Sequence, residues 1–443
     1  MATPSACPSP IRPARSGAAS EPGRQSAHGP ASETDVTTTD PAAAADGAPA
    51  PSATWRYAIA AAASLAIAAA AYGLGRQPVA GAQLQLSLIL GLAFGFVLQR
   101  SRFCFFCIWR DWLDRRDPRG LIGIITALAA GLAGYTLVFG AWLPDPSGTR
   151  LPPTAHIGPV GPALILGGLA FGAGMAISGS CISAHLYRLG EGSPTAPFAL
   201  IGTGAGFILG FLSWNPVYLA VIAEAPVIWL PRQLGYAGAL TLGLAVAAAA
   251  VIVLARRLPR RPAPAAIDPI QAVFITRWPA WVGGLAIGAI ATAAYLRLSP
   301  LGVTAEIGAR MRQAADAAGL LPARLEGLDT LRGCATLVRD ALLTPNGLFV
   351  LGLVAAGFVA AVLSGAFRPT RPGPGHIARG LLGGLLLGFG AMIGLGCTVG
   401  TLLSGIMAGA ASGWIHCVAL IVGTTATLRA GRHLGLLEGP AAG

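Results

Sequence analysis

Residues 163–187 read ALILGGLAFGAGMAISGSCISAHLY, and residues 378–400 read ARGLLGGLLLGFGAMIGLGCTVG. The two stretches share four glycines and one cysteine at a constant offset of 216 residues. The matched pairs are Gly167 with Gly383, Gly168 with Gly384, Gly172 with Gly388, Gly174 with Gly390, and Cys181 with Cys397. Small residues suit helix contacts in general, so glycines alone can match by chance. Because the cysteine is in register too, we interpret the stretches as copies of one repeat.

Both copies lie in a chain of 443 residues that is 54% hydrophobic and only 11% charged. Apolar runs of roughly 18 residues or more recur along it, each long enough to cross the ~30 Å hydrocarbon core of a bilayer as a helix. We therefore predict an all-α polytopic membrane protein with about ten hydrophobic helices. The expected spans are 57–74, 82–99, 120–143, 163–187, 196–214, 236–255, 278–297, 347–367, 378–400 and 412–430.

The net charge of +12 comes from arginines that gather in short clusters between apolar runs. This distribution is typical of orientation signals in membrane proteins and does not favour a nucleic-acid partner. The clusters lie at 100–119, 256–261 and 368–379. If the N-terminus is cytoplasmic, alternation of the spans places all three on the cytoplasmic side, as the positive-inside rule requires. The connection 298–345 falls outside, where long segments obey this rule poorly.

On this topology the fourth and ninth spans run in opposite directions, so the two copies form an inverted repeat. Inverted repeats are typical of transporters, whose substrate sites lie where the halves meet. We therefore divide the chain into a disordered cytoplasmic tail (1–54), a first transmembrane half (55–261) and a second transmembrane half (262–443). The tail is rich in Ala, Pro, Ser and Thr and has too few large apolar residues to form a core.

Each repeat carries its cysteine directly beside glycines, in Gly179-Ser180-Cys181 and in Gly394-Leu-Gly396-Cys397-Thr398-Val-Gly400. Glycine allows a helix to break, and the freed backbone N–H groups at a helix terminus favour anions. Such irregular backbone at membrane depth is tolerated where it lines a cavity. A thiol is small, polarizable and a weak hydrogen-bond donor. The pattern predicts glycine-broken helices at the centre and a path for a sulfur-containing anion, although a buried cysteine can also be a small hydrophobe.

The other polar residues give weaker signals. The chain has seven cysteines, an odd number, which argues against a secreted disulfide framework. Cys104-Phe-Phe-Cys107 matches a redox or metal CxxC pattern, but there is no second CxxC, so we predict no metal and no cofactor. Arg188 and Glu191, three residues apart, form a structural pair or guard the inner mouth of the path. For His185 we expect a hydrogen bond to the backbone rather than a ligand role.

The chain also resembles the YeeE/YedE family of sulfur transport membrane proteins over roughly residues 82–430. The residues that carry the resemblance are Leu98-Gln-Arg100-Ser-Arg-Phe-Cys104-Phe, Arg110-Asp111, Gly179-Ser-Cys181, Leu186-Tyr-Arg188-Leu-Gly190-Glu191-Gly192, Gly394-Leu-Gly396-Cys397-Thr-Val-Gly400, Ser404-Gly405 and Gly413-Trp414. The resemblance implies an hourglass-like inverted-repeat fold and thiosulfate as substrate. It also implies that Cys104, Cys181 and Cys397 pass the substrate along by thiol contacts. Ser180 and Thr398-Val399 depart from the family pattern.

Together these observations predict a non-enzymatic permease of the bacterial inner membrane, with both termini cytoplasmic, that imports thiosulfate or a related sulfur-containing anion. The expected substrate-binding residues are Cys104, Cys181, Cys397, Gly179, Ser180, Gly396, Thr398, Gly400, Arg188 and Glu191. The expected partners are the anion, the lipid bilayer and a small cytoplasmic sulfur-carrier protein. The alternative is a membrane-embedded thiol redox or sulfur-transfer enzyme that uses Cys104 and Cys107.

The predicted orientation can be tested with reporter fusions placed after residue 440. Because the arginine clusters put the C-terminus in the cytoplasm, a reporter that works only in the cytoplasm should be active there. A reporter that works only in the periplasm should be inactive. Periplasmic activity at this position would overturn the predicted orientation.

Overall fold

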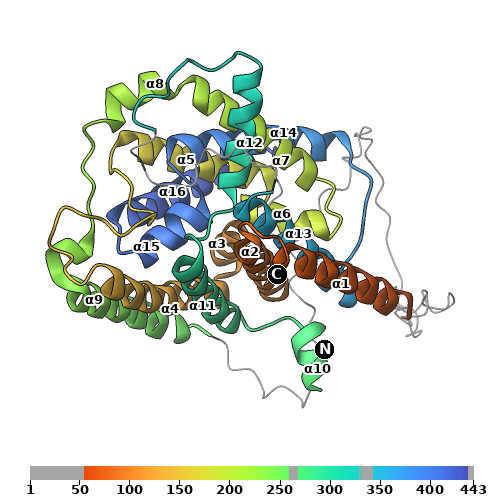
Figure 1. Ribbon diagram of the computed structural model, residues 1–443. Coiled ribbons are helices and arrows are strands. Elements are labelled where there is room, and N and C mark those ends of the chain that lie inside the picture. The colour runs from red at the N-terminus through yellow and green to blue at the C-terminus, as the bar shows by residue number, and fades with distance from the viewer. Residues whose placement is uncertain (1–53, 259–267, 329–330, 332–342, 438–443) are drawn as a thin grey trace, which may run out of the picture.

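The computed structural model describes residues 54–258, 268–328, 331 and 343–437, which fold into helices joined by loops (Figure 1). Apart from Thr54, the predicted tail lies outside the described residues. The α-helices are α1 (Thr54–Gly75), α2 (Gly81–Ser101), α3 (Phe105–Arg115), α4 (Arg119–Trp142), α5 (Pro162–Ser178), α6 (Ile182–Gly190), α7 (Ala196–Leu212), α8 (Trp214–Val217), α9 (Leu230–Ala255), α10 (Pro269–Phe274), α11 (Ala280–Arg297), α12 (Thr304–Ala317), α13 (Pro345–Leu363), α14 (Pro374–Ile393), α15 (Gly405–Met407) and α16 (Ala411–His433). Two π-helices, η2 (Tyr218–Ile222) and η3 (Thr398–Ser404), complete the set.

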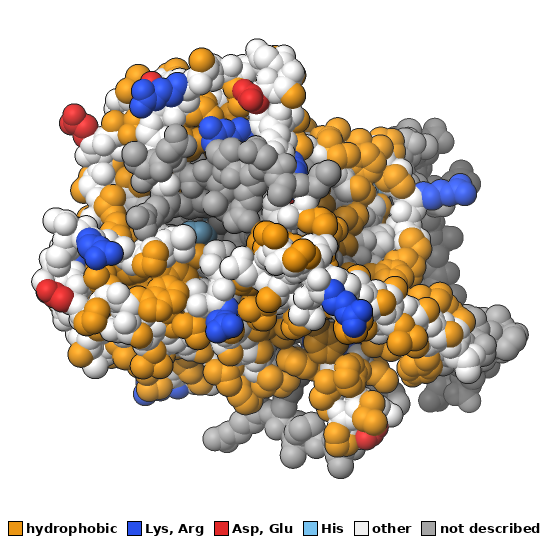
Figure 2. Space-filling view, viewed as in Figure 1, with side chains coloured by type: hydrophobic (Ala, Val, Ile, Leu, Met, Phe, Trp, Pro, Cys, Tyr) orange, Lys and Arg blue, Asp and Glu red, His pale blue; other side chains and the backbone are white. Residues whose placement is uncertain are grey.

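The long helices confirm the all-α membrane fold. Among the described residues, nine helical segments are long and apolar enough to cross a bilayer. A tenth is the pair formed by α7 with α8 and η2, which is bent by 61°. Each of the ten spans predicted from the sequence coincides with one of these segments. Hydrophobic side chains cover much of the surface visible in Figure 2, as an exterior in contact with lipid requires.

The fourth and ninth spans are broken at the predicted glycines. α5 ends at Ser178 and α6 begins at Ile182, with Gly179 between them at a φ of 81°. α14 ends at Ile393 and η3 begins at Thr398, with Gly396 at a φ of 153°. These φ values lie in the region that glycine adopts readily. Leu395 also has a positive φ, of 57°. This conformation costs a residue with a side chain about 1 kcal/mol or more.

α5 and α14, the first helices of the two copies, cross at their glycines. A Cβ added at Gly174 would lie 2.6 Å from the carbonyl oxygen of Gly383, and one at Gly390 would lie 2.6 Å from that of Gly167. These two contacts are repeat mates, because the offset of 216 relates Gly174 to Gly390 and Gly167 to Gly383. As the residue number rises along α5 it falls along α14, so the two copies run antiparallel. Their packing has the inverted symmetry that the sequence predicts.

The remaining spans obey the same symmetry. α2 packs on α13 as α11 packs on α4, and α5 packs on α16 as α14 packs on α7. The outcome is two groups of four packed helices, one of α2, α4, α11 and α13, and the other of α5, α7, α14 and α16 (Figure 1). Each group takes two helices from each half of the chain, so the halves interlock. The short helices α6 and α15 contact members of both groups, which places the second segments of the broken spans between them.

The arginine clusters share one end of the helical bundle. Arg432, at the end of α16, forms two hydrogen bonds of 2.7 Å with Asp114 of α3, and Arg257 after α9 stacks on Trp112 of α3 at 5.7 Å. The backbone N–H of Arg368, after α13, donates to the carbonyl oxygen of Glu191 at 3.2 Å. We call this the arginine-rich end. Glu326, in the described part of 298–345, lies at the opposite end. Its carbonyl oxygen accepts a hydrogen bond of 2.9 Å from Trp214, which follows the end of α7.

The close helix contacts can be tested with two Gly→Ala variants. A methyl group at Gly388 would collide with the carbonyl oxygen of Thr203, whereas one at Gly140 of α4 would meet no atom within 4 Å. We expect Gly388→Ala to lose about 1–3 kcal/mol of stability by overpacking. Gly140→Ala should be neutral or up to about 1 kcal/mol more stable, because alanine favours helix.

The measurement is thermal unfolding of the detergent-solubilised variants. A Gly388→Ala protein that unfolds at the wild-type temperature would show that α7 and α14 do not pack as described.

Candidate functional site

Three of the predicted residues begin helices inside the bundle. Cys104 is the N-cap of α3, Cys181 of α6 and Cys397 of η3, and all three thiols are fully buried. The first N–H groups of a helix have no partner within the helix, and they carry its partial positive charge. An anion or a thiolate is therefore favoured at an N-cap. The sequence predicts helix breaks beside Cys181 and Cys397, and each of these cysteines lies at the start of the helix that follows. Cys104 occupies the same position at the start of α3, which the pattern of glycines does not predict.

Cys104 and Cys181 meet although they are far apart in the sequence. The Cys104 thiol lies within interaction distance of the thiols of both Cys107 and Cys181. The Cys181 sulfur also interacts with the backbone N–H groups of Phe105 and Ala184, and it lies 3.3 Å from the hydroxyl of Ser183. Two helix N-termini therefore point at one sulfur. We call Cys104, Cys107 and Cys181 the three-thiol cluster.

Arg188 brings a positive charge to this cluster. Its guanidinium donates to the Cys107 sulfur at 3.1 Å and to the carbonyl oxygen of Gly179 at 3.4 Å. Glu191 accepts instead from Arg102 at 2.8 Å and from the Gln99 amide at 3.1 Å. Each of the two residues thus has a described partner other than the ion pair proposed between them. Arg188 faces the thiols, and Glu191 anchors Arg102 at the arginine-rich end.

Each broken span also carries a buried hydroxyl beside its cysteine. The hydroxyls of Ser180 and Thr398 have no hydrogen-bond partner among the described residues. Both side chains are fully buried. A buried polar group without a partner costs about 1–3 kcal/mol, so such groups are rare away from sites that bind water or a ligand. These two departures from the family pattern therefore each hold a buried hydroxyl that the described residues leave without a partner.

The cysteines lie at two levels of the bundle. Ser178, just before Cys181, contacts Gly383 near the start of α14, and Gly394, just before Cys397, contacts Gly167 near the start of α5. The stretch of α14 between these contacts spans about 16 Å at 1.5 Å per residue. The Cys104 thiol lies beside that of Cys181 and therefore belongs to the same end of the crossing. Cys397 follows the break at the other end, because α5 and α14 are antiparallel.

Three histidines lie around these levels. His185 lies 3.1 Å from the hydroxyl of Ser178, where we had expected a backbone partner. His156, in the connection between α4 and α5, interacts with the backbone of Gly400, and the predicted site did not include it. Burial lowers the pKa of His156, and the Gly400 interaction opposes this only in part. His416 of α16 was also missed, since an isolated histidine in an apolar run carries no pattern.

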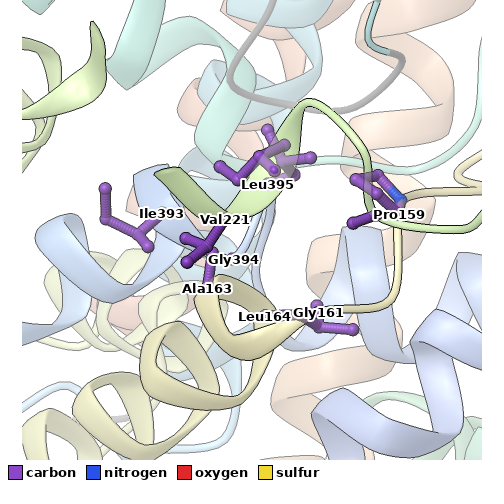
Figure 3. Close-up of a pocket in the computed structure, with 10 residues that line it drawn as sticks. Pro159, Gly161, Ala163, Leu164, Val221, Ile393, Gly394 and Leu395 are labelled. Atoms are coloured by element: carbon purple, nitrogen blue, oxygen red, sulfur yellow. The ribbon is translucent and has the colours of Figure 1, made fainter. Parts of the chain in front are cut away.

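A small pocket adjoins the Cys397 level (Figure 3). Its walls are the start of α5, η2 and the turn that follows α14. The lining residues are Pro159, Gly161, Ala163, Leu164, Val221, Ile222, Ala225, Ile393, Gly394 and Leu395. Because Gly394 and Leu395 belong to the turn that leads to Cys397, the pocket lies beside the second break at the end remote from the arginine clusters.

The described residues contain no group of three or more His, Cys, Asp or Glu arranged to hold a metal ion. The contacts of Cys104 and Cys107 are instead with a third thiol and with a guanidinium. The site thus offers soft sulfur atoms, helix N-termini, one arginine and buried hydroxyls, which together suit an anion that contains both sulfur and oxygen.

Residues 100–426 match the family model described as sulphur transport. The chain belongs to the sulphur transport family. This confirms the resemblance predicted from the residues around Cys104, Cys181 and Cys397. Family members are transporters rather than enzymes, and the ten apolar segments make this one a multi-pass membrane protein.

Two curated relatives cover most of the chain. The thiosulfate transporter TsuA of Spirochaeta thermophila is 27% identical over 348 residues, which is 76% of this chain and 95% of the relative. The thiosulfate transporter TsuA of Escherichia coli K12 is 27% identical over 378 residues, which is 77% of this chain and 93% of the relative. The similarity therefore extends over nearly the whole length of both sulphur transport proteins.

The arrangement of thiols predicts a specific pattern of oxidative cross-links. In a Cys107→Ser variant treated with iodine, we expect a disulfide between Cys104 and Cys181, because their side chains are in contact. Cys397 should stay reduced, because its helix break lies at the other end of the α5–α14 crossing, about 16 Å away at 1.5 Å per residue. Mass spectrometry of the digested protein identifies the linked peptides. A Cys181–Cys397 disulfide would contradict the two-level arrangement.

Proposed function

We propose that this chain is a permease that imports thiosulfate, or a related sulfur-containing anion, through a path lined by the thiols of Cys104, Cys181 and Cys397. The observation that carries the proposal is that all three thiols are N-caps of helices inside the bundle. The relatives named thiosulfate transporters support this choice of anion.

The chemistry of the thiols suits such a substrate. The outer sulfur of thiosulfate is soft and polarizable, and a thiol can donate a weak hydrogen bond to it without holding a charge of its own. The backbone N–H groups at the same helix N-termini stabilise the negative charge. An anion that is bound weakly at each of two levels, about 16 Å apart, can pass from one to the other.

Arg188 and the two hydroxyls complete the proposed path. The guanidinium beside Cys107 supplies positive charge at the three-thiol cluster. The hydroxyls of Ser180 and Thr398 are placed to donate to the oxygens of the anion. The glycines at 179, 396 and 400 keep the surrounding backbone close and free of side chains. Glu191 holds Arg102 beside the path rather than binding the substrate directly.

The direction of transport follows from the proposed orientation. If the arginine-rich end is cytoplasmic, both termini are cytoplasmic in an inner-membrane protein. Substrate then meets Cys397 first and the three-thiol cluster last. The cluster would deliver the anion at the end where the arginines lie, and a small sulfur-carrier protein could receive it there. Uptake of radiolabelled thiosulfate into proteoliposomes, with sulfate, sulfite and selenite as competitors, tests the activity and its selectivity.

Single substitutions separate the path thiols from the others. We predict that Cys181→Ser, Cys397→Ser and Cys104→Ser each abolish uptake with normal membrane abundance, because a hydroxyl is harder and more strongly hydrated than a thiol. At a site that only packs, the same change should cost about 1–3 kcal/mol of stability and leave uptake in place. Cys417→Ser, in a half-buried position of α16, is the matched control for this outcome.

Cys107→Ser should be tolerated, because a serine oxygen can still accept the hydrogen bond from Arg188. Loss of uptake with this variant would favour the alternative, a thiol redox or sulfur-transfer enzyme that uses the contact between Cys104 and Cys107. Full uptake by both Cys181→Ser and Cys397→Ser would exclude the thiol path.

A further inference from the structure

His416 is a fully buried histidine in the first turns of α16, and its ring nitrogens form no hydrogen bond with any described residue. The backbone of Leu164 lies near the ring, but not in the geometry of a hydrogen bond. An imidazole always carries at least one N–H donor, and burying it without a partner is costly. The ring therefore has hydrogen-bonding capacity that the helices around it do not use.

The ring lies between the pocket and the turn that leads to Cys397. A methyl group at Gly394 would lie 3.4 Å from Cε1 and 3.5 Å from Nδ1 of His416, and one at Gly168 would lie 3.3 Å from Nδ1. Leu164 and Gly394 both line the small pocket beside this turn. The imidazole thus adjoins the pocket wall at the first level that a substrate would reach.

Packing alone does not explain a histidine at this position. The backbone carbonyl of His416 lies on Gly168, and the backbone carbonyl of Ala199 lies on Gly384. Gly168 and Gly384 are repeat mates, so Ala199 is the counterpart of His416 in the other half. A small apolar residue makes the same helix contact there. The two halves therefore differ at this contact, where one has a histidine and the other an alanine.

The two levels also differ in their chemistry. The three-thiol cluster offers sulfur atoms, whereas the residues near Cys397 include the unpartnered hydroxyl of Thr398 and the unpartnered imidazole of His416. An anion such as thiosulfate has a soft sulfur at one end and hard oxygens at the other. Oxygen and nitrogen donors suit the oxygens, and thiols suit the sulfur.

We infer that His416 is a further substrate-binding residue, whose imidazole N–H donates a hydrogen bond to an oxygen of the anion as it passes from the pocket to Cys397. The inference rests on the proposed function and adds a means of selectivity. The residues at the Cys397 level recognise the oxygens of a sulfur oxyanion, and the three-thiol cluster recognises its sulfur.

The test compares His416→Leu, which keeps the ring's approximate volume without a donor, with His416→Gln, which keeps an N–H donor. In proteoliposomes we expect His416→Leu to raise the KM for thiosulfate about tenfold or more, as expected for the loss of a hydrogen bond to a charged group. Hydrosulfide, which has no oxygen, should inhibit the Leu variant and the wild type at equal concentrations. His416→Gln should restore the KM to within a few-fold of the wild-type value.

Stability gives a second readout that separates binding from packing. Removing a buried polar group without a partner should raise the melting temperature of the ligand-free protein, so His416→Leu should unfold at a higher temperature than the wild type. Thiosulfate should raise the melting temperature of the wild type more than that of His416→Leu. Cys417→Ser, the next residue of α16, should lower the melting temperature rather than raise it, and thiosulfate should raise that temperature by as much as in the wild type.

An unchanged KM for His416→Leu, or equal weakening towards thiosulfate and hydrosulfide, would overturn the inference. A lower melting temperature with an unchanged KM would show that the imidazole only supports the helices. If the wild type itself fails to transport thiosulfate, or Cys397→Ser transports it normally, the proposed function has failed rather than the role of His416.

Discussion

The structure depends on the contact between α5 and α14, where glycines of each helix meet the backbone of the other. Apolar side chains give helices no drive to associate in lipid, so close backbone approach and van der Waals packing must supply it. The same glycines fix the crossing as antiparallel, which places the two breaks at opposite ends of the pair. Side chains at Gly174 and Gly383 would separate the helices and lose both the repeat symmetry and the position of each cysteine.

The chemistry of the candidate site follows from the helix breaks after α5 and α14. Each break ends a helix inside the bundle and starts another, and the cysteine occupies the N-cap of the second. A helix N-terminus buried in a membrane protein needs partners for its N–H groups, and an anionic ligand can provide them. A third helix N-terminus, that of α3, also faces Cys181, through the backbone N–H of Phe105. Anion affinity is thus provided mainly by backbone, with Arg188 as the charged side chain at the three-thiol cluster.

Much of this arrangement was predictable from the sequence. The apolar runs predict every span, because length and hydropathy alone decide what can cross a bilayer. The register of Gly167 with Gly383 and of Cys181 with Cys397 predicts the inverted repeat and the breaks. The meeting of Cys104 with Cys181 was not predictable from pattern, since it depends on how two breaks 77 residues apart pack together. The contact between Arg188 and Cys107 depends on the same packing, and a lone His416 in an apolar run has no periodicity to reveal it.

The central claim is that a sulfur anion binds at two levels, each beside a cysteine N-cap. The most direct measurement is a crystal structure with selenosulfate, in which selenium replaces the soft sulfur of thiosulfate and gives an anomalous signal. We expect one selenium peak in contact with the three-thiol cluster and a second, separate peak in contact with Cys397. Selenium peaks remote from all three N-cap cysteines would contradict it.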